Sequence, residues 1–403
     1  MKKLAKLFFS FTISIWEILS ILPLACLALL SRFSPCKRID IGIGPEPIIN
    51  NVYHAQALKL YGYSVETYAT ELYYITSDFD ITFWPHNRLA RAFAVKILHV
   101  PFIYAIFKFK ILYIYFNGGS LFGSLLLWRF EPYFYMLAGI RTVVMPYGSD
   151  IQVMDKTQNL YFKHSVFVDY PRHHLRRNII KAKIKLWTEC ADHIICGCDW
   201  VDFLYHWDTL LVSHFAIDVS RIKLVIDKQE HAKNSQLPQC RNNLFKVFHA
   251  PNHKAIKGTN ALIEAIEALK KEGYKIELVL AQKKPNIEIL ESISQSDLVV
   301  DQLVIGWYAM FAIEAMAMGK PVICNMRPDL LFLYKSAGLI GLNDPPLIHA
   351  DVLSITSVLR QCLTGQIDIA HYAAASQSYV EKTHSLEAIG NVFDQINKSV
   401  LKF

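Results

Sequence analysis

The 403-residue chain lacks the short motifs that mark several common classes of enzyme. It contains no G-x-G-x-x-G segment and no P-loop, so neither nicotinamide chemistry nor ATP hydrolysis has support. Its eight Cys residues form no C-x-x-C pair, and Cys196 and Cys198 are too close together for a zinc knuckle. This cysteine pattern gives no metal site and indicates reduced thiols in a cytosolic compartment.

Charged residues are also scarce, at 19% of the chain, whereas hydrophobic residues make up 53%. This balance excludes a disordered chain, and the length is sufficient for two domains with substantial cores. The net charge of +7 fits anionic membranes, nucleotides or nucleic acid about equally well. An aromatic content of 13% suits a protein with one face against lipid or a large ligand.

The N-terminal segment 1–35 is predicted to associate with membranes, because residues 8–30 are almost all apolar. At helical spacing its polar residues share one arc: Lys2, Lys3, Lys6, Ser10, Ser14, Glu17 and Ser20. We expect Pro23 to interrupt the helix, and Glu17 at mid-bilayer would cost at least ~3 kcal/mol. We therefore predict a helix in the membrane surface on the cytoplasmic face, with a single span as the alternative.

Two other segments have alternative interpretations. Residues 92–116 are apolar and predict a buried helix followed by a core strand, or else a surface that docks on lipid beside the N-terminal helix. The segment Arg172–Lys185 is strongly basic, but its charges spread around the helix. It is expected to be solvated rather than to bind nucleic acid, with anionic lipid head groups or an acceptor phosphate as alternatives.

Buried strands alternate with helices along the rest of the chain, which predicts parallel sheets covered on both faces. We expect an α/β protein with two Rossmann-like domains, 36–227 and 244–383, joined by a polar linker at 228–243. Residues 384–403 are expected to form a C-terminal helix that packs back on the first domain. In such sheets ligands bind at the carboxyl ends of the strands, so the site should lie in the cleft between the domains.

Glu314 is the most informative single residue, because its helix is otherwise apolar and a buried unpaired carboxylate is costly. The vicinal hydroxyls of a ribose would supply two donors to it; the alternative is a salt bridge to a neighbouring Lys or Arg. The preceding turn, Gly306, Trp307, Tyr308 and Ala309, opens the helix. Its free N–H groups predict an anion site for a diphosphate.

The segment Glu314–Ile323, EAMAMGKPVI, resembles the E-A-M-A-x-G-x-P-V-I motif of retaining GT-B glycosyltransferases. In that family a second Glu lies eight residues earlier and contacts the transferred sugar, whereas this chain has Gly306. The resemblance implies that Glu314 binds the donor ribose. Because Gly306 replaces this glutamate, the resemblance does not predict which sugar is transferred and, to a smaller degree, how active the protein is.

The segment His249–Thr259 resembles the turn of the same family in which Arg and Lys bind the donor pyrophosphate. Lys257 matches the Lys that directly precedes the family glycine, here Gly258. Lys254 or His253 takes the place of the usual Arg. A solvated lysine pair is the alternative interpretation of this segment.

The first half resembles the family more weakly. Gly42–Pro47, which includes Gly44, looks like its first glycine loop and is predicted to help bind the donor. Asn117, Gly118 and Gly119 follow a strand and are predicted to face the acceptor. Tyr147–Asp150 is similar to an H-G-S-D turn, and the resemblance favours Asp150 as the group that orients the incoming hydroxyl, with a turn cap as the alternative.

The resemblance implies transfer of a sugar from a nucleotide-sugar to a glycan or lipid-linked acceptor in surface polysaccharide synthesis, with retention. Positive charge at Lys257 would stabilise the departing phosphate in place of a metal, so we expect neither metal nor cofactor. Two alternatives are a GT-B sugar-nucleotide epimerase and a non-catalytic protein that binds sugar nucleotides.

Overall fold

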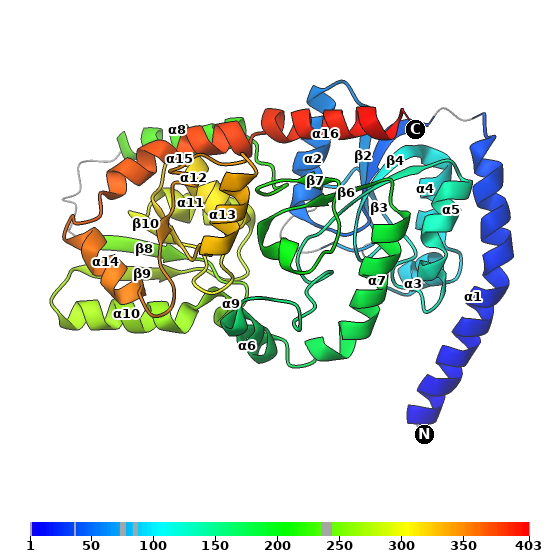
Figure 1. Cartoon of the computed structure of the whole chain (residues 1–403), viewed down its shortest axis with the longest axis horizontal. Coiled ribbons are helices and arrows are strands. Elements are labelled where there is room, and N and C mark those ends of the chain that lie inside the picture. Colours follow the sequence, from blue (N-terminus) through cyan, green and yellow to red (C-terminus); the bar gives the residue numbers. More distant parts are fainter. Residues whose placement is uncertain (1, 36–37, 73–77, 84–87, 235–243, 403) are drawn as a thin grey trace.

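A computed structural model describes residues 2–35, 38–72, 78–83, 88–234 and 244–402. The strands form two sheets, and every strand pairing in this part of the chain is parallel. Figure 1 shows the two sheets side by side, each with its own helices. The predicted α/β architecture of two Rossmann-like units is therefore confirmed.

The first half contains a seven-stranded sheet in the order β3-β2-β1-β4-β5-β6-β7. This extends the doubly wound order of dinucleotide-binding sheets by one edge strand. Its strands are β1 (Ile39–Ile43), β2 (Val65–Ala69), β3 (Ile81–Thr82), β4 (Phe109–Tyr115), β5 (Arg141–Met145), β6 (His193–Cys196) and β7 (Thr209–Leu210). Its helices are α1 (Lys2–Arg32), α2 (Ile49–Leu60), α3 (Arg88–Lys96), α4 (Val100–Lys108), η1 (Leu127–Arg129), α5 (Glu131–Leu137), α6 (Leu160–Asp169), η2 (His173–Arg176), α7 (Arg177–Cys190) and η3 (Cys198–Asp202).

The second half contains a five-stranded sheet in the order β12-β11-β10-β8-β9, so the strand order reverses between β8 and β10. Its strands are β8 (Phe245–His249), β9 (Ile276–Leu280), β10 (Leu298–Val300), β11 (Val322–Cys324) and β12 (Ile348–His349). Its helices are α8 (Val219–Asn234), α9 (Lys254–Lys257), α10 (Thr259–Lys271), α11 (Asn286–Ser294), α12 (Met310–Ala317), α13 (Pro328–Ser336), α14 (Ile355–Leu363), α15 (Ile369–Thr383) and α16 (Leu386–Val400).

The chain passes from the first half to the second earlier than the polar composition of residues 228–243 predicts. Helix α8 packs against α11 and α12 of the second half, so the crossing precedes residue 219. Ile222 and Val225 are buried at helical spacing, which explains why the helix continues into the polar stretch. Residues 228–234 of the predicted linker are therefore helical, and 235–243 lie outside the described residues.

Helix α16 returns from the second half and packs on α2 of the first. Figure 1 shows it running along the upper edge of the molecule toward the first sheet. The hydroxyl of Tyr113, in the central strand β4, donates to Asn397 Oδ1 at 2.9 Å, and that of Tyr63 donates to Asp394 Oδ1 at 2.9 Å. The C-terminal helix thus completes the first half and ties the two halves together.

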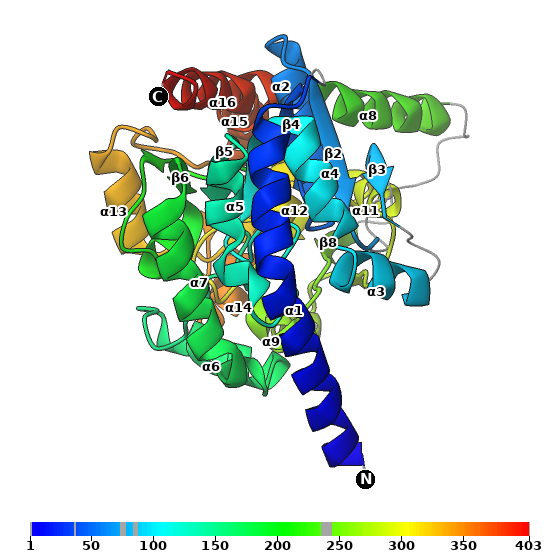
Figure 2. The ribbon, with the colours of Figure 1, turned by 90° about the vertical axis from the view of Figure 1, so that its right-hand side faces the viewer.

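Helix α1 runs from Lys2 to Arg32 without interruption, so the predicted break at Pro23 is wrong. Pro23 removes one helical hydrogen bond, but Leu24 and, one turn later, Ala28 are buried where α1 packs against α4 and α5. This packing offsets the loss of the bond. Figure 2 shows α1 lying along the first half, with its N-terminal turns extending beyond the body.

Glu17 on α1 faces the protein. Only 2% of its surface is exposed, and its carboxylate accepts the N–H groups of Leu125 and Leu126 at 2.9 and 2.6 Å. The segment Phe11–Arg32 is long and apolar enough to cross a membrane by length and composition. To span a bilayer, however, it would have to give up these hydrogen bonds.

Candidate functional site

A cavity of about 210 Å³ lies where the two halves meet. Most of its lining follows the carboxyl ends of three neighbouring strands: Ala250, Asn252 and Lys257 after β8; Lys283, Lys284 and Asn286 after β9; Ala309, Met310 and Glu314 after β10. Ile49, at the start of α2, closes it from the first half. The cavity therefore sits at the reversal of strand order, where open α/β sheets bind ligands.

Glu314 lies on α12 with 6% of its surface exposed and lines this cavity. Its Oε1 accepts a hydrogen bond from the Asn286 amide at 2.6 Å. Burial raises the pKa of Glu314 to about 7, although the Asn286 hydrogen bond acts in the opposite direction. No Lys or Arg lies within ion-pair distance of it in the described part of the chain, so the salt-bridge alternative does not apply here.

Asn286 adds an unused acceptor to the same place. Its Oδ1 is buried and has no hydrogen-bond partner among the described residues. A buried amide oxygen without a partner is costly unless a ligand or water satisfies it. Glu314 and Asn286 thus present acceptors that a ligand with adjacent hydroxyl groups would satisfy.

Lys257 lines the cavity and is also held by an internal carboxylate. Its Nζ lies 2.6 Å from Asp301 Oδ1, and its side chain keeps 14% exposure. Asp301 follows β10 directly, is fully buried, and its Oδ2 accepts the Ala309 N–H at 3.1 Å. The Lys and the N–H expected to meet a phosphate therefore both contact Asp301 in the free protein.

Gly306, Trp307 and Tyr308 do not line the cavity, so their predicted contact with the donor is not what this structure shows. The indole of Trp307 is fully buried and donates to the Val212 carbonyl at 3.1 Å. The Tyr308 hydroxyl lies 2.6 Å from that of Tyr379. Trp307 thus packs between the halves, whereas Tyr308 packs against Tyr379 and His384. Of the predicted turn, Ala309 alone belongs to the lining.

Gly306 has a structural reason to be glycine. Its φ is +98°, and a Cβ there would lie 2.5 Å from Arg327 Cγ. Arg327 is fixed in place by Asp202 of the first half, with N–O distances of 2.7 and 3.0 Å. A glutamate at 306, as in the resembling family, cannot fit beside this ion pair.

Three residues of the predicted pyrophosphate turn also lie outside the lining. His253 contacts the Tyr170 hydroxyl, and Lys254 is exposed at the start of α9. Gly258 has φ +73°, and a Cβ there would lie 2.8 Å from the side chain of Leu303. Of the predicted cations, Lys257 is the one that reaches the cavity.

The backbone of this turn is bound by the other half of the molecule. The N–H groups of Ala255 and Ile256 donate to the Asp169 carboxylate at 3.4 and 2.9 Å. Gly44, predicted from the first glycine loop, does not belong to the cavity lining. It packs against β2 instead, where a Cβ would lie 2.2 Å from the Tyr68 carbonyl oxygen.

Asp150 has no exposed surface, and its carboxylate accepts three backbone N–H groups. These belong to Phe116 at 3.1 Å, Tyr147 at 3.1 Å and Gly148 at 2.9 Å. Burial raises its pKa to about 7, opposed by the hydrogen bonds. The carboxylate therefore holds its loop, and its role in orienting an incoming hydroxyl stays a prediction.

Asn117, Gly118 and Gly119 build the neighbouring loop. Asn117 Nδ2 donates to Glu46 Oε1 and to the Tyr147 hydroxyl, each at 2.7 Å. Gly118 has φ +108°, and the Cβ of a residue at 119 would lie 2.3 Å from the Tyr135 hydroxyl. These predicted acceptor-side residues are thus held by Glu46, Tyr147 and Glu131.

Asp301 and Asn286 were not predicted from the sequence, although a signal was present. Both belong to segments that follow buried strands, where side chains at the carboxyl edge meet. Lys183, which is buried on α7 and donates to the Asn117 carbonyl at 2.7 Å, was not predicted either. Burial lowers the pKa of Lys183 to about 8.

The whole architecture has counterparts among solved structures. No family model and no curated protein matches the sequence. A sucrose-phosphate synthase from Thermosynechococcus elongatus matches with a TM-score of 0.59 at 13% identity, over 91% of this chain and 100% of that one. An alpha,alpha-trehalose-phosphate synthase (UDP-forming) from Burkholderia vietnamiensis matches with a TM-score of 0.52 at 9% identity, over 90% and 100%. The chain therefore has the two-domain GT-B fold.

Proposed function

We propose that this protein is a glycosyltransferase that moves a sugar from a nucleotide-sugar to a hydroxyl of a glycan or lipid-linked acceptor. The observation that carries the proposal is the pair of acceptors at Glu314 and Asn286, buried at the reversal of strand order. The 2′- and 3′-hydroxyls of a ribose are adjacent donors and would satisfy both groups. This is the role that the resemblance assigns to Glu314.

The cations of the same cavity suit the diphosphate of the donor. Lys257, Lys283 and Lys284 all line it. Charge grows on the departing phosphate during transfer, and positioned ammonium groups stabilise it. We propose that this lysine set works without a divalent metal, and that Asp301 holds Lys257 in place until the phosphate arrives.

The cavity is smaller than most ligand sites. Pockets for small molecules usually measure about 300–1,000 Å³, whereas this one measures about 210 Å³. A nucleotide-sugar therefore requires the halves to separate at Ile49 and close again around it. Closure would exclude water and limit hydrolysis of the donor.

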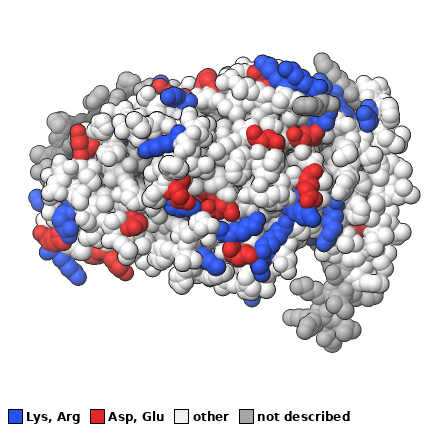
Figure 3. Space-filling view, viewed as in Figure 1, with Lys and Arg blue, Asp and Glu red and all other residues white. Residues whose placement is uncertain are grey.

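We further propose that α1 places the enzyme on the cytoplasmic face of a membrane. Large apolar side chains of α1 and the residue after it are exposed: Phe11, Ile18, Leu19, Leu22, Leu30 and Phe33. In Figure 3 the right edge of the molecule, along which α1 runs, carries few charged side chains, whereas Lys and Arg gather over α7 and near the upper right corner of the same face. Because Glu17, Leu24 and Ala28 bind the protein, the helix lies on the membrane rather than across it. Release by alkaline carbonate without detergent tests this.

Nucleotide binding tests the core of the proposal. The full chain is screened by thermal shift against UDP, GDP, ADP and CMP, because a ligand that binds the folded state raises Tm. One of them should raise Tm for the wild type but not for Glu314→Ala. The control is Glu267→Ala, an exposed carboxylate on α10. No shift with any nucleotide, or an equal shift in both proteins, would contradict the proposed site.

Activity then separates the alternatives. The chain is incubated with the sugar forms of the nucleotide that binds, with and without a membrane lipid extract. Acceptor-dependent release of the nucleotide with a sugar-bearing product supports transfer. Interconversion of the sugar nucleotide without acceptor would identify an epimerase, and binding without turnover would identify a non-catalytic protein.

A further inference from the structure

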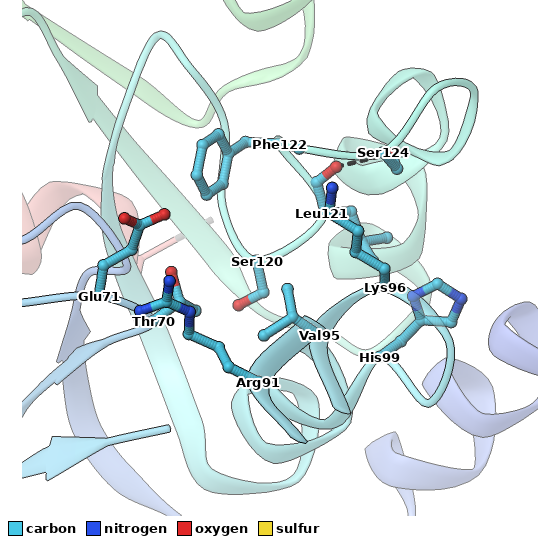
Figure 4. A pocket seen from close by; sticks show the side chains of 11 residues that line it. Thr70, Glu71, Arg91, Val95, Lys96, His99, Ser120, Leu121, Phe122 and Ser124 are labelled. Carbon is cyan, nitrogen blue, oxygen red and sulfur yellow. Dashed lines mark hydrogen bonds between the residues drawn. The ribbon is translucent and has the colours of Figure 1, made fainter. Parts of the chain in front are cut away.

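A second cavity, of about 330 Å³, lies wholly in the first half. Thr70 and Glu71 line it just beyond the carboxyl end of β2, Arg91 and Lys96 on α3, and Ser120 after β4. Figure 4 shows the Arg91 side chain extending toward Thr70 and that of Lys96 toward Leu121. Two cations from one helix thus approach the same pocket.

The polar groups of this pocket suit an anion. Within the described residues neither Arg91 nor Lys96 has a carboxylate in ion-pair distance, and Glu71 is the single acid in the lining. His99 also lines the pocket, is 4% exposed, and its Nε2 is buried without a partner. Arg and Lys donors together with hydroxyl groups are the chemistry that binds phosphate.

Helix α1 borders the pocket from two sides. The Trp16 indole donates to the Ile97 carbonyl at 3.1 Å, two residues before His99. Glu17 accepts the N–H of Leu125, which follows the last lining residue of the 120–124 loop. The pocket is therefore built against the same helix that carries the exposed apolar face.

Apolar side chains surround this junction. Phe93, Leu98 and Leu125, each adjacent or close in sequence to a lining residue, are 56%, 47% and 44% exposed. Exposed apolar groups next to a cationic pocket fit a ligand with a hydrocarbon part and a phosphate. A soluble phosphate compound has no hydrocarbon part that would contact these exposed apolar side chains.

The pocket also lies on the correct edge of the sheet for an acceptor. It begins at the carboxyl end of β2, and β2 pairs with β1, whose own carboxyl end leads to Ile49 in the donor cavity. A molecule anchored in the pocket can extend along this edge toward the donor.

We propose that this pocket binds the phosphate of a lipid-linked acceptor whose hydrocarbon chain lies on the apolar rim beside α1. The proposal rests on the proposed function, and names the acceptor as a phosphate-bearing lipid. The sugar or hydroxyl that receives the transferred unit would then extend toward Ile49.

Binding to vesicles tests the proposal. The full chain is titrated with phosphatidylcholine vesicles that contain a few per cent of a long-chain prenyl phosphate, the matching prenol, or phosphatidylglycerol. The test variant is Arg91→Gln with Lys96→Gln. The matched control is Arg32→Gln with Arg129→Gln, which removes the same charge from two exposed positions, the end of α1 and the end of η1, outside the pocket lining.

We expect the wild type and the control to bind prenyl phosphate vesicles at least tenfold more tightly than the other two kinds, and the test variant to lose this preference. Residual binding to neutral vesicles should remain unchanged. Equal binding to phosphatidylglycerol, or the same loss in the control, would overturn the proposal in favour of surface charge alone. Displacement by micromolar inorganic phosphate would instead identify a site for a soluble anion and overturn the lipid assignment.

The nucleotide thermal shift is measured on the same proteins. A shift retained in the test variant, with the lipid preference lost, supports both proposals. A lipid preference absent from a wild type that still binds nucleotide overturns this inference alone. Absence of nucleotide binding overturns the proposed function, whatever the vesicles show.

Discussion

Glu314 and Asp150 are both buried carboxyl groups, one in each half, and burial raises the pKa of each to about 7. They differ in what their oxygens do. The carboxylate of Asp150 accepts three backbone N–H groups, whereas Glu314 accepts one side-chain amide and lines a cavity. Burial and a raised pKa therefore do not identify a ligand site; unused hydrogen-bonding capacity at a cavity does.

The two halves differ in the same way as these two residues. In the first half Glu131 is fully buried and accepts the N–H groups of Gly119 and Leu121, so it too holds a loop. In the second half Glu314 and Asn286 retain free acceptors. The second half thus keeps unused acceptors at its cavity, whereas the cavity of the first half is the separate pocket near α1.

The largest effect should come from removing the carboxylate of Asp150. Asp150→Ala leaves three buried N–H groups without acceptors, which costs about 3–5 kcal/mol of unfolding free energy. Asp150→Asn should cost less, because one oxygen can still serve Tyr147 and Gly148. Urea denaturation measures both. An alanine variant as stable as the wild type would show that the Asp150 carboxylate does not hold its loop.

The next largest effect should follow from Lys257→Ala. Loss of the ammonium should reduce turnover by about 10²–10³-fold, because it stabilises the leaving phosphate. The matched control is Lys254→Ala, an exposed lysine outside the cavity lining, which should retain turnover within a few-fold.

The same variant leaves Asp301 buried without its partner, which is destabilising in itself. Adding Asp301→Asn to Lys257→Ala separates the two effects. Stability should recover in the double variant, while turnover should stay low. Recovery of turnover as well would show that Lys257 acts only by supporting Asp301.

The sequence predicts the fold well, because buried strands and helices alternate with clear boundaries. It also places Glu314, because a lone acid on an apolar helix needs a partner. It does not reveal which side of the turn faces the ligand. Trp307 and Tyr308 follow a strand as Ala309 does, but Trp307 packs against the first half and Tyr308 against Tyr379, and tertiary packing alone decides that.

Packing also decides what a buried acid does. Asp150 has the residue type and position of a functional acid, but the number of N–H groups that surround it depends on how the loops after β4 and β5 fold together. Asn286 was not predicted because its place after a buried strand does not show that its side chain meets Glu314. Its partner Glu314 lies 28 residues away.

A smaller effect is expected from Glu314→Gln. The amide keeps one acceptor but replaces the other with donors, so nucleotide affinity should fall about 10–100-fold by calorimetry. The folded pKa of Glu314 lies above its unfolded value, so ionisation destabilises the fold as pH rises from about 4.5 to about 7. Gln removes this penalty, so Tm relative to the wild type should be higher at pH 8 than at pH 5. A loss of Tm at pH 8 would indicate that Glu314, like Asp150, serves the fold.

The smallest effect is a pH dependence of nucleotide affinity. Ribose hydroxyls donate to the ionised form of Glu314, which the free protein populates only above a pKa of about 7. Affinity should therefore fall as pH drops below about 7, by up to about tenfold per pH unit. The phosphates of the ligand also titrate near pH 6, so the same titration on Glu314→Gln gives their share. The difference between the pH dependence of nucleotide affinity in the wild type and in Glu314→Gln gives the contribution of the Glu314 carboxylate. Parallel curves would mean that this carboxylate does not contact the ligand, and Glu314 would then no longer differ from Asp150.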